Sequence, residues 1–428
     1  MTKQNTSGRF FNRLLKGLCI VSVVCISSLS VAVDTDNDGL PDDWEIANGR
    51  DPLVADYMIS AGYGVDCALD DTGVVCWGLA NGSTAIPSLN NITRLSVGLN
   101  YSCVIDDTGV VTWGGGGGGF AAVPDLINPR EVSCNNISHC AIDDTGVVCW
   151  GATARSSRVP DMLRPSQISS GTDFSPGGIQ GCAIDDESHV VCWGTPYGNG
   201  ADESLIVPPS ISNPKSVSVS SSGTFACALD VTNAVCWGYN EYGQTTVPAL
   251  SIPTQVSVGG KHACAIDNNG VTCWGDNYHG QTDVPTLSNP MQVSAGGTHT
   301  CALDDNGVVC WGGNWTDYGL TNVPVLLIDP DGDGYTNQGG ADLFPLDASE
   351  WLDTDSDGIG NNADTDDDGD SISDTDEVSN GTNPLLADTD SDGVNDNIDI
   401  FPLDATESVD TDSDGIGNNA DTDDDGDG

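Results

Sequence analysis

A short motif repeated seven times is the feature that most constrains how this chain can fold. Its best-preserved copies, Cys264–Gly275 and Cys301–Gly312, share the pattern Cys-Ala-x-Asp-x-Asn-Gly-Val-x-Cys-Trp-Gly. Every copy contains a Trp-Gly pair, and a Val-Pro or Ile-Pro pair follows it. The copies recur at intervals of 36 to 44 residues, with their tryptophans at Trp77, Trp113, Trp150, Trp193, Trp237, Trp274 and Trp311.

Each copy has the sequence of a β-hairpin with one further strand before it. Two apolar runs flank a turn rich in Asp, Asn and Gly, as at 70–73, and another run such as Gln255–Val258 precedes them. A fourth strand is expected near the Val-Pro pair, because proline is compatible with the edge of a sheet. Four strands repeated seven times at this period predict an all-β fold, a seven-bladed β-propeller over residues 57–328.

The repeated aromatic and imidazole side chains are expected to have structural roles. A tryptophan at the same place in every copy most often packs blade against blade, and ligand binding is the less favoured explanation. His262 and His299 each stand two residues before a repeated cysteine. We therefore expect them to be hydrogen-bonded parts of the fold rather than metal ligands.

The pattern of residues 257–281, Ser-Val-Gly-Gly-Lys-His-Ala-Cys-Ala-Ile-Asp…Gly-Val…Trp-Gly-Asp-Asn…Gly-Gln, resembles the regulator of chromosome condensation repeat. The short period and the cysteine pair are similar to the bacterial secreted branch of that family. The resemblance covers 57–328 and implies a seven-bladed propeller. Nuclear members of the family are guanine-nucleotide exchange factors. That activity is not expected here, because an exported protein does not meet a nuclear GTPase and no matching interaction residues are recognised.

Paired cysteines in six of the copies predict a disulfide framework. Residues that face each other across a hairpin with a two-residue turn can be nine apart, which is the spacing of every pair except 182/192. The expected disulfides join Cys67 to Cys76, Cys140 to Cys149, Cys182 to Cys192, Cys227 to Cys236, Cys264 to Cys273 and Cys301 to Cys310. A three-residue turn with a bulge would instead place the first cysteine opposite the tryptophan. Metal binding is the rival explanation, although no Cys-x-x-Cys spacing occurs.

Two further cysteines of the repeat region stand outside this scheme. Cys103 has Thr112 where its partner belongs, and Cys134 is an additional cysteine at the start of the third copy. We predict that Cys103 and Cys134 form a disulfide across the boundary between the second and third blades.

The first 32 residues predict a secretory signal peptide. A basic segment from Lys3 to Lys16 precedes an apolar run over 18–29, and a small-x-small site follows at 30–32. A membrane anchor is the rival explanation, but the run is short for a bilayer span, and a lipoprotein signal ending at Cys25 is a weaker alternative. Removal of this segment leaves 14 of the 16 cysteines, an even number that suits disulfides in an exported protein. We expect a secreted or cell-surface protein.

The charge balance favours metal cations as partners. The chain has 12 Lys and Arg against 64 Asp and Glu, a net charge of −52 at pH 7. This excess disfavours nucleic acid and anionic lipid, because both are polyanions. Residues 329–428 hold 32 of the acids and no Lys or Arg.

Residues 34–45 have the spacing of a twelve-residue calcium-binding loop. As in an EF-hand loop, oxygen ligands stand at positions 1, 3, 5, 9 and 12 and glycine stands at position 6. The candidate ligands are Asp34, Asp36, Asp38, Asp42 and Glu45. The spacing predicts a short calcium-binding segment, 33–56, before the propeller.

The same alternation of aspartates recurs after the propeller, over 329–428. The candidate Ca²⁺ ligands there are Asp329, Asp331, Asp333, Asp353, Asp355, Asp357, Asp364, Asp366, Asp368, Asp370, Asp374, Glu377, Asp388, Asp390, Asp392, Asp399, Asp410, Asp412, Asp414 and Asp421. The unit Phe-Pro-Leu-Asp-Ala occurs twice, at Phe344 and Phe401. A last loop begins at Asp423 and is interrupted at Gly428, which suggests a longer natural chain or a truncated gene model.

This acidic region resembles thrombospondin type 3 calcium-binding repeats. So many like charges without cations would repel one another, and few apolar residues oppose that repulsion. We therefore expect calcium to act as the core of an extended region with little regular secondary structure. A disordered acidic spacer is the alternative.

Three functional classes are compatible with this organisation. The favoured one is a binding or adhesion protein, in which a calcium-stiffened stalk presents the propeller to an extracellular protein or glycan. Variable aromatic stretches after the Trp-Gly pairs, Tyr239–Tyr242, Asp276–His279 and Asn314–Tyr318, favour it. The second is a secreted inhibitor similar to the propeller-type β-lactamase inhibitory proteins.

The third class is a hydrolase, and the chain is not expected to be an enzyme. Its sequence shows no Ser/His/Asp constellation, zinc motif or phosphate loop, and the glycine run at 114–119 opens no helix. We expect no nucleic-acid partner and no membrane span. We expect the protein to be a monomer.

Overall fold

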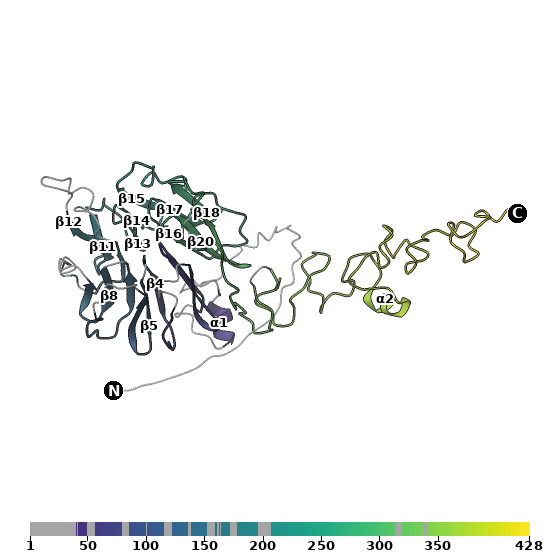
Figure 1. Ribbon diagram of the computed structural model, residues 1–428, viewed down its shortest axis with the longest axis horizontal. Coiled ribbons are helices and arrows are strands. Elements are labelled where there is room, and N and C mark those ends of the chain that lie inside the picture. Colours follow the sequence, from purple (N-terminus) through teal and green to yellow (C-terminus); the bar gives the residue numbers. More distant parts are fainter. Residues whose placement is uncertain are drawn as a thin grey trace, which may run out of the picture.

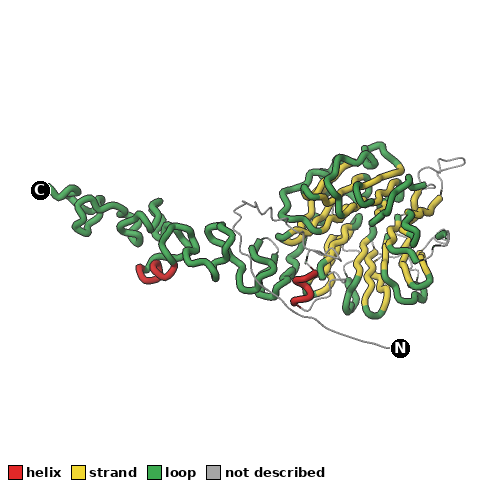
Figure 2. The backbone as a smooth tube through the Cα atoms, turned by 180° about the vertical axis from the view of Figure 1, so that it is seen from behind, coloured by secondary structure: helices red, strands yellow, loops and turns green. Residues whose placement is uncertain are grey.

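The computed structural model describes residues 40, 42–48, 56–78, 85–99, 101–114, 122–135, 138–151, 159–160, 162, 164–171, 178–195, 207–313, 319–337 and 340–428. The predicted signal peptide, the loop 314–318 and the predicted ligands Asp34, Asp36 and Asp38 lie outside them. Figure 1 shows two parts, a ring of β-sheets and an extended chain that leads from the last blade to the C-terminus. The extended part consists almost entirely of loops and turns (Figure 2).

The ring is built from seven three-stranded antiparallel sheets, which confirms the predicted seven-bladed propeller. In order around the ring, the strands are β1 (Met58–Ala61), β2 (Val65–Asp70), β3 (Gly73–Gly78); β4 (Arg94–Val97), β5 (Tyr101–Asp106), β6 (Gly109–Gly114); β7 (Glu131–Cys134), β8 (Ser138–Asp143), β9 (Gly146–Gly151); β10 (Gln167–Ser170), β11 (Gly178–Ile184), β12 (Val190–Thr195); β13 (Ser216–Val219), β14 (Phe225–Leu229), β15 (Ala234–Gly238); β16 (Gln255–Val258), β17 (His262–Asp267), β18 (Gly270–Gly275); β19 (Gln292–Ala295), β20 (His299–Asp304) and β21 (Gly307–Gly312).

Two short helices complete the described chain, α1 (Asp42–Asn48) and α2 (Asp374–Asn380). Neither has the length and hydropathy that a bilayer span requires.

The expected fourth strand near each Val-Pro pair is wrong, because each sheet has three strands in the described chain. Proline lacks the N–H that a strand would donate. The segment after the Val-Pro pair instead binds the hairpin turn of the next blade. The Ser288 N–H donates to the Asp304 carboxylate at 2.8 Å, and the Asp305 N–H donates to the Ser288 carbonyl at 3.0 Å. Each sequence repeat therefore ends on its neighbour rather than on its own blade.

The hairpins have two-residue turns, which decides between the two registers that the sequence allowed. Asp70 pairs with Gly73, and Cys67 consequently faces Cys76. The Asp70 carboxylate accepts the Thr72 N–H at 2.9 Å, which closes the turn. Gly73 has φ +111°, a conformation that side chains with a Cβ rarely adopt. The longer spacing in the fourth blade is absorbed by a wider turn between Ile184 and Val190.

All seven predicted cysteine pairs are brought together in disulfide geometry. The Cα atoms of the six pairs within blades are 4.0 Å apart. Cys103 and Cys134 are 6.1 Å apart between Cα atoms and join β5 to β7 across the blade boundary. Thr112 lies opposite Cys103 within the second blade.

The repeated tryptophans are buried between blades, as their regular spacing predicted. Trp274 of the sixth blade packs on Phe225 and Leu229 of the fifth. Its indole N–H donates to the Gln244 carbonyl at 3.0 Å. One large side chain thus contributes both apolar burial and a satisfied polar group at the junction.

A ring of seven serine hydroxyls joins the innermost strands, and the sequence analysis missed it. Each hydroxyl oxygen accepts a backbone N–H from the innermost strand of the next blade, at 2.8 to 3.1 Å. The signal was available, because every innermost strand has serine at its third position. The serine ring consists of Ser60, Ser96, Ser133, Ser169, Ser218, Ser257 and Ser294.

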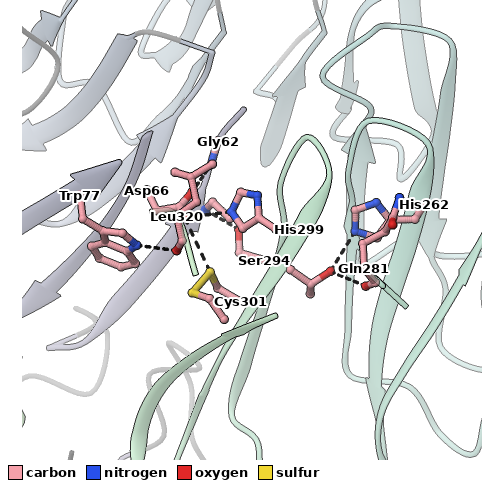
Figure 3. Close-up of a disulfide and its surroundings, with 12 residues drawn as sticks. Gly62, Asp66, Trp77, His262, Gln281, Ser294, His299, Cys301 and Leu320 are labelled. Atoms are coloured by element: carbon pink, nitrogen blue, oxygen red, sulfur yellow. Dashed lines mark hydrogen bonds and ion pairs between the residues drawn. A yellow bond between two sulfur atoms is a disulfide. The ribbon is translucent and has the colours of Figure 1, made fainter. Parts of the chain in front are cut away.

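The junction between the seventh and first blades closes the ring (Figure 3). His299 Nε2 lies 2.8 Å from the Asp66 carboxylate, and both side chains are at most 1% exposed. The Trp77 indole N–H donates to the Leu320 carbonyl at 2.8 Å. The Leu327 N–H donates to Asp70 at 2.9 Å. The segment after the seventh blade therefore binds the first blade's turn, as the other post-proline segments bind their neighbours.

His262 forms the equivalent contact one junction earlier. The Thr300 hydroxyl donates to the Gln281 carbonyl at 2.9 Å, so His262 Nε2, 2.9 Å from that hydroxyl, is the donor to it. Burial lowers the pKa of His262 to about 3, and the neighbouring His299 contributes to the shift. The imidazole is thus neutral in the folded propeller.

The folded propeller should lose stability on acidification through His262. The unfolded chain binds a proton at this residue below a pKa of about 6.5, whereas the folded chain does not until about 3. The penalty grows by about 1.4 kcal/mol per pH unit within that window. Glutamine, the residue at this place in the fourth blade, can still donate to Thr300, so His262→Gln should lose less stability than the unaltered protein as the pH falls from about 6 to about 4.

Denaturant unfolding followed by tryptophan fluorescence measures this difference. His189→Gln is the matched control, because that side chain is 64% exposed. The explanation fails if both variants show the same pH dependence as the unaltered protein.

Peptide mapping without reduction should recover all seven cysteine pairs, including a cross-blade peptide that contains Cys103 and Cys134. Their proximity in adjacent blades is the reason. A free thiol at either position in the exported protein would contradict the pairing.

Candidate calcium sites

Six acidic loops of the C-terminal region have one common backbone arrangement. The Asp at position 1 of each loop accepts the N–H of position 6 at 2.8 to 3.1 Å. Position 6 has a positive φ throughout, and it is glycine in every loop except one, where Ser371 has φ +81°. The six loops begin at Asp329, Asp353, Asp366, Asp388, Asp410 and Asp423.

The aspartates at positions 3 and 5 are fixed by one oxygen each. Asp368 accepts the Asp370 N–H at 3.2 Å, and Asp370 accepts the Ile372 N–H at 2.7 Å. The carboxylates of positions 1, 3 and 5 consequently converge. One oxygen from each of Asp366, Asp368 and Asp370 lies within 4.8 Å of the other two, as in the loops that begin at Asp329 and Asp353.

Buried carboxylate oxygens in these loops have no hydrogen-bond donor from the protein. Burying an ionised carboxylate without a partner is costly, so this arrangement favours a bound cation or a proton on the carboxylate. Divalent calcium binds six to eight such oxygens, and the residues present fit it. The oxygens belong to Asp331, Asp333, Asp342, Asp353, Asp366, Asp367, Asp368, Glu377, Asp390 and Asp399.

Helix α2 supplies the strongest single indication of a metal site. Ser373 caps its N-terminus, and Gly381, with φ +87°, ends it. The helix places Glu377 at 0% exposure, with neither carboxylate oxygen hydrogen-bonded within the protein. Burial, followed by repulsion from Asp368 and Asp370, raises the pKa of Glu377 to about 7. A carboxylate held in this way is a candidate position-12 ligand.

Helix α1 has the same place in the N-terminal loop. Glu45 stands at its position 12, as Glu377 does in the other loop, and is also 0% exposed. Asp42 opens the helix, as Asp374 opens α2. The other three predicted ligands of this loop lie outside the described residues.

The predicted aspartate ligands at positions 9 and 12 of these loops have two kinds of environment. Asp364, Asp399 and Asp421 interact electrostatically with the position-3 carboxylates of their loops, as ligands at position 12 should. Asp374 instead accepts the Asp367 N–H at 3.0 Å, which ties two parts of the loop together. Its role as a direct ligand remains a prediction.

Asp342 is a candidate ligand that the sequence analysis did not name. It is 3% exposed, one oxygen has no donor, and it interacts with Asp331 of the loop that begins at Asp329. Burial, followed by the neighbouring Asp333, raises the pKa of Asp331 to about 6. A signal existed, because Asp342 precedes Phe344 by two residues as Asp399 precedes Phe401.

The first of these loops lies at the closing junction of the propeller. The Asp329 N–H donates to the Asp71 carboxylate at 2.8 Å. A cavity of about 440 Å³ separates this loop from the seventh blade and is lined by Leu40, Leu303 and Phe344 among others. The chain that closes the ring thus continues directly into a candidate metal loop.

Known protein families match segments of both the propeller and the acidic loops. The regulator of chromosome condensation (RCC1) repeat matches residues 254–281 and 292–319. The bacterial TSP3 repeat matches 34–55 and 366–387, the two segments that contain α1 and α2. No curated protein sequence is significantly similar to this chain.

Solved propellers are similar at low identity. The CRINKLY WD40 ectodomain of the Arabidopsis thaliana receptor kinase ACR4 is 24% identical, with a TM-score of 0.47 over 59% of this chain and 94% of that chain. The ectodomain of the Physcomitrella patens receptor kinase CR4 is 21% identical, with a TM-score of 0.49 over 60% and 73%. Prp20p from Saccharomyces cerevisiae is 16% identical, with a TM-score of 0.43 over 55% and 74%. The chain therefore carries RCC1 repeats in a propeller of seven blades and bacterial TSP3 repeats on both sides of it.

Proposed function

We propose that this is an exported calcium-binding protein in which a calcium-stiffened acidic region, 329–428, carries the propeller, 57–328, as an interaction module. The observation that carries the proposal is the set of buried carboxylate oxygens without protein donors, above all those of Glu377. Bound Ca²⁺ would supply the charge that these oxygens lack.

The acidic region has little apolar burial with which to order itself. Leu352, Ile359 and Ile398 are 42%, 47% and 70% exposed, so they form no continuous core. Its carboxylates raise one another's pKa, which means that repulsion opposes the folded loops. Metal binding and ordering are therefore one process in this region.

Export is supported by the predicted signal peptide, residues 1–32, and by the seven cysteine pairs in disulfide geometry. An intracellular reducing environment would leave such pairs open. We also propose that the exported protein is retained at the cell surface.

A binding role is proposed for the propeller rather than a catalytic one. The Asp66–His299 pair resembles an acid–base pair in distance, but burial keeps any substrate away from it. Exposed aromatic side chains gather on the loops of the fifth and sixth blades, where Tyr239, Tyr242 and Tyr278 are 45%, 40% and 86% exposed. Such residues are typical of recognition surfaces.

Removal of calcium should expand the acidic region. We expect EDTA to change the circular dichroism of the full chain and to increase its radius of gyration in small-angle scattering, with both effects reversed by added calcium. Glu377→Gln should weaken one calcium site by about tenfold or more in a calorimetric titration, because it removes a charged ligand.

Asp424→Asn is the matched control for Glu377→Gln. It removes the same charge from an exposed side chain at position 2 of a loop, which supplies no ligand. Equal calcium titrations for the two variants, or no response of the full chain to EDTA, would refute the calcium proposal.

The interaction role is tested by cross-linking the calcium-loaded, disulfide-intact full chain to the proteins and glycans of its natural surroundings. Cross-links to partners should fall on 57–328. Cross-links confined to 329–428 would assign recognition to the acidic region instead.

A further inference from the structure

We propose that the propeller binds a neutral saccharide at the mouth of its central channel, with the ring of Tyr63 as a stacking surface. This inference rests on the proposed interaction function and names its ligand class. The mouth contains a cavity of about 590 Å³, within the size range of small-ligand sites. Its lining includes Tyr63, Asn135, Lys261, Asp276, His279 and Thr298.

The cavity continues into a narrower one of about 160 Å³ inside the ring, which the serine ring lines. Tyr63, Asn135 and Ser221 line both. The wall of this inner part consists of serine hydroxyls, the Asn135 amide, backbone groups and small apolar side chains, without a charged side chain. The whole channel therefore offers hydrogen-bonding groups of both kinds at low charge.

The rim of the cavity is preorganised by hydrogen bonds between blades. The Gly260 N–H donates to the Gly296 carbonyl at 3.0 Å, and the Gly297 N–H donates to the Gly62 carbonyl at 2.9 Å. The Tyr63 N–H donates to the Gly98 carbonyl at 3.3 Å. These bonds connect four consecutive blades, so a ligand need not order the rim on binding.

The Tyr63 ring contacts glycine backbone on one side and is largely exposed. A Cβ at Gly297 would lie 2.3 Å from Tyr63 Cδ2, so the ring rests directly on the glycine backbone. Tyr63 is nevertheless 53% exposed. An exposed aromatic ring supported by backbone can pack against the C–H face of a pyranose, while its hydroxyl can hydrogen-bond at the edge.

The charges around the cavity favour a neutral ligand. Lys261 and Asp276 contribute opposite formal charges to the lining. The Lys261 ammonium is also engaged by Tyr242, at 3.1 Å from its hydroxyl and 4.5 Å from its ring centroid. The net charge of the chain, −52, repels anionic sugars.

A protein partner fits this cavity less well. Interface hot spots are apolar or aromatic anchors in well-packed, desolvated pockets. The cavity has no such desolvated anchor: Tyr63 and the carbon atoms of the other lining residues form most of its exposed surface, and hydroxyl, amide and charged groups are spread between them. Three Ser or Thr hydroxyls and the Asn135 amide beside an aromatic ring and a mainly apolar surface match a sugar, which presents both hydroxyls and C–H faces.

The test uses the calcium-loaded full chain and four probes, the neutral maltotriose, cellotriose and chitotriose and the anionic trigalacturonate. Saturation-transfer NMR detects binding, and calorimetry measures it. We expect at least one neutral probe to bind and trigalacturonate to bind more weakly. Tyr63→Ala should weaken the neutral probe by about tenfold or more, whereas Tyr63→Phe, which keeps the ring, should stay within about threefold.

Val231→Ala is the matched control, because that side chain is 53% exposed, as Tyr63 is, and does not line the cavity. Unfolding followed by tryptophan fluorescence verifies that each variant is folded. The inference is overturned if no neutral probe binds, if trigalacturonate binds most tightly, or if Tyr63→Ala and Val231→Ala have equal effects. Partners that cross-link elsewhere on 57–328 would leave the interaction function standing while this site fell.

Discussion

The propeller depends on the contact between the innermost strands of neighbouring blades. Each such strand has four residues, and its inner edge has no strand partner. A serine hydroxyl from the preceding blade accepts one N–H of that edge at every junction, and an unmade bond of this kind costs about 1 to 3 kcal/mol. Serine suits the place because the blades converge at the axis, where a larger side chain would fill the channel.

Further contacts of the same kind join neighbouring blades at other points along and outside the innermost strands. Glutamines two residues before the serine repeat the arrangement at three junctions, where Gln167, Gln255 and Gln292 accept N–H groups of the next blade. Farther out, the tryptophans pack on the preceding blade, and the post-proline segments bind the next turn. Neighbour-to-neighbour contacts at every radius make the ring a closed chain of equivalent junctions.

Period and turn chemistry were sufficient to predict the blades, the tryptophan packing and the cysteine pairs. They led to a wrong fourth strand, because the Val-Pro segment resembles an edge strand in composition but is fixed by bonds to the next blade. The serine ring was not predicted, since serine has no strong preference that distinguishes an inter-blade acceptor from a surface residue.

In the acidic region, spacing identified most candidate ligands. Asp342 escaped because it stands two places beyond position 12, and the cavity at the channel mouth arises from loops of several blades that only the closed ring brings together.

The two parts of the chain are stabilised in opposite ways. In the propeller, acids such as Asp70 accept backbone N–H groups, so negative charge is compensated locally. In the acidic region, backbone groups compensate one oxygen of an aspartate and leave the other facing its neighbours. The propeller thus compensates its own negative charges, whereas the acidic region holds buried carboxylate oxygens that a bound cation would stabilise.

The closing junction has a mechanical consequence. Among the described residues, the disulfides lie within blades or join the second blade to the third, and none crosses from the seventh blade to the first. The chain that leaves Leu327 and Asp329 leads straight into the acidic region, so tension along that region reaches the propeller at the one junction where the ring's continuity rests on non-covalent contacts alone. The His299–Asp66 and Trp77–Leu320 hydrogen bonds are then the contacts that resist opening of the ring under such tension.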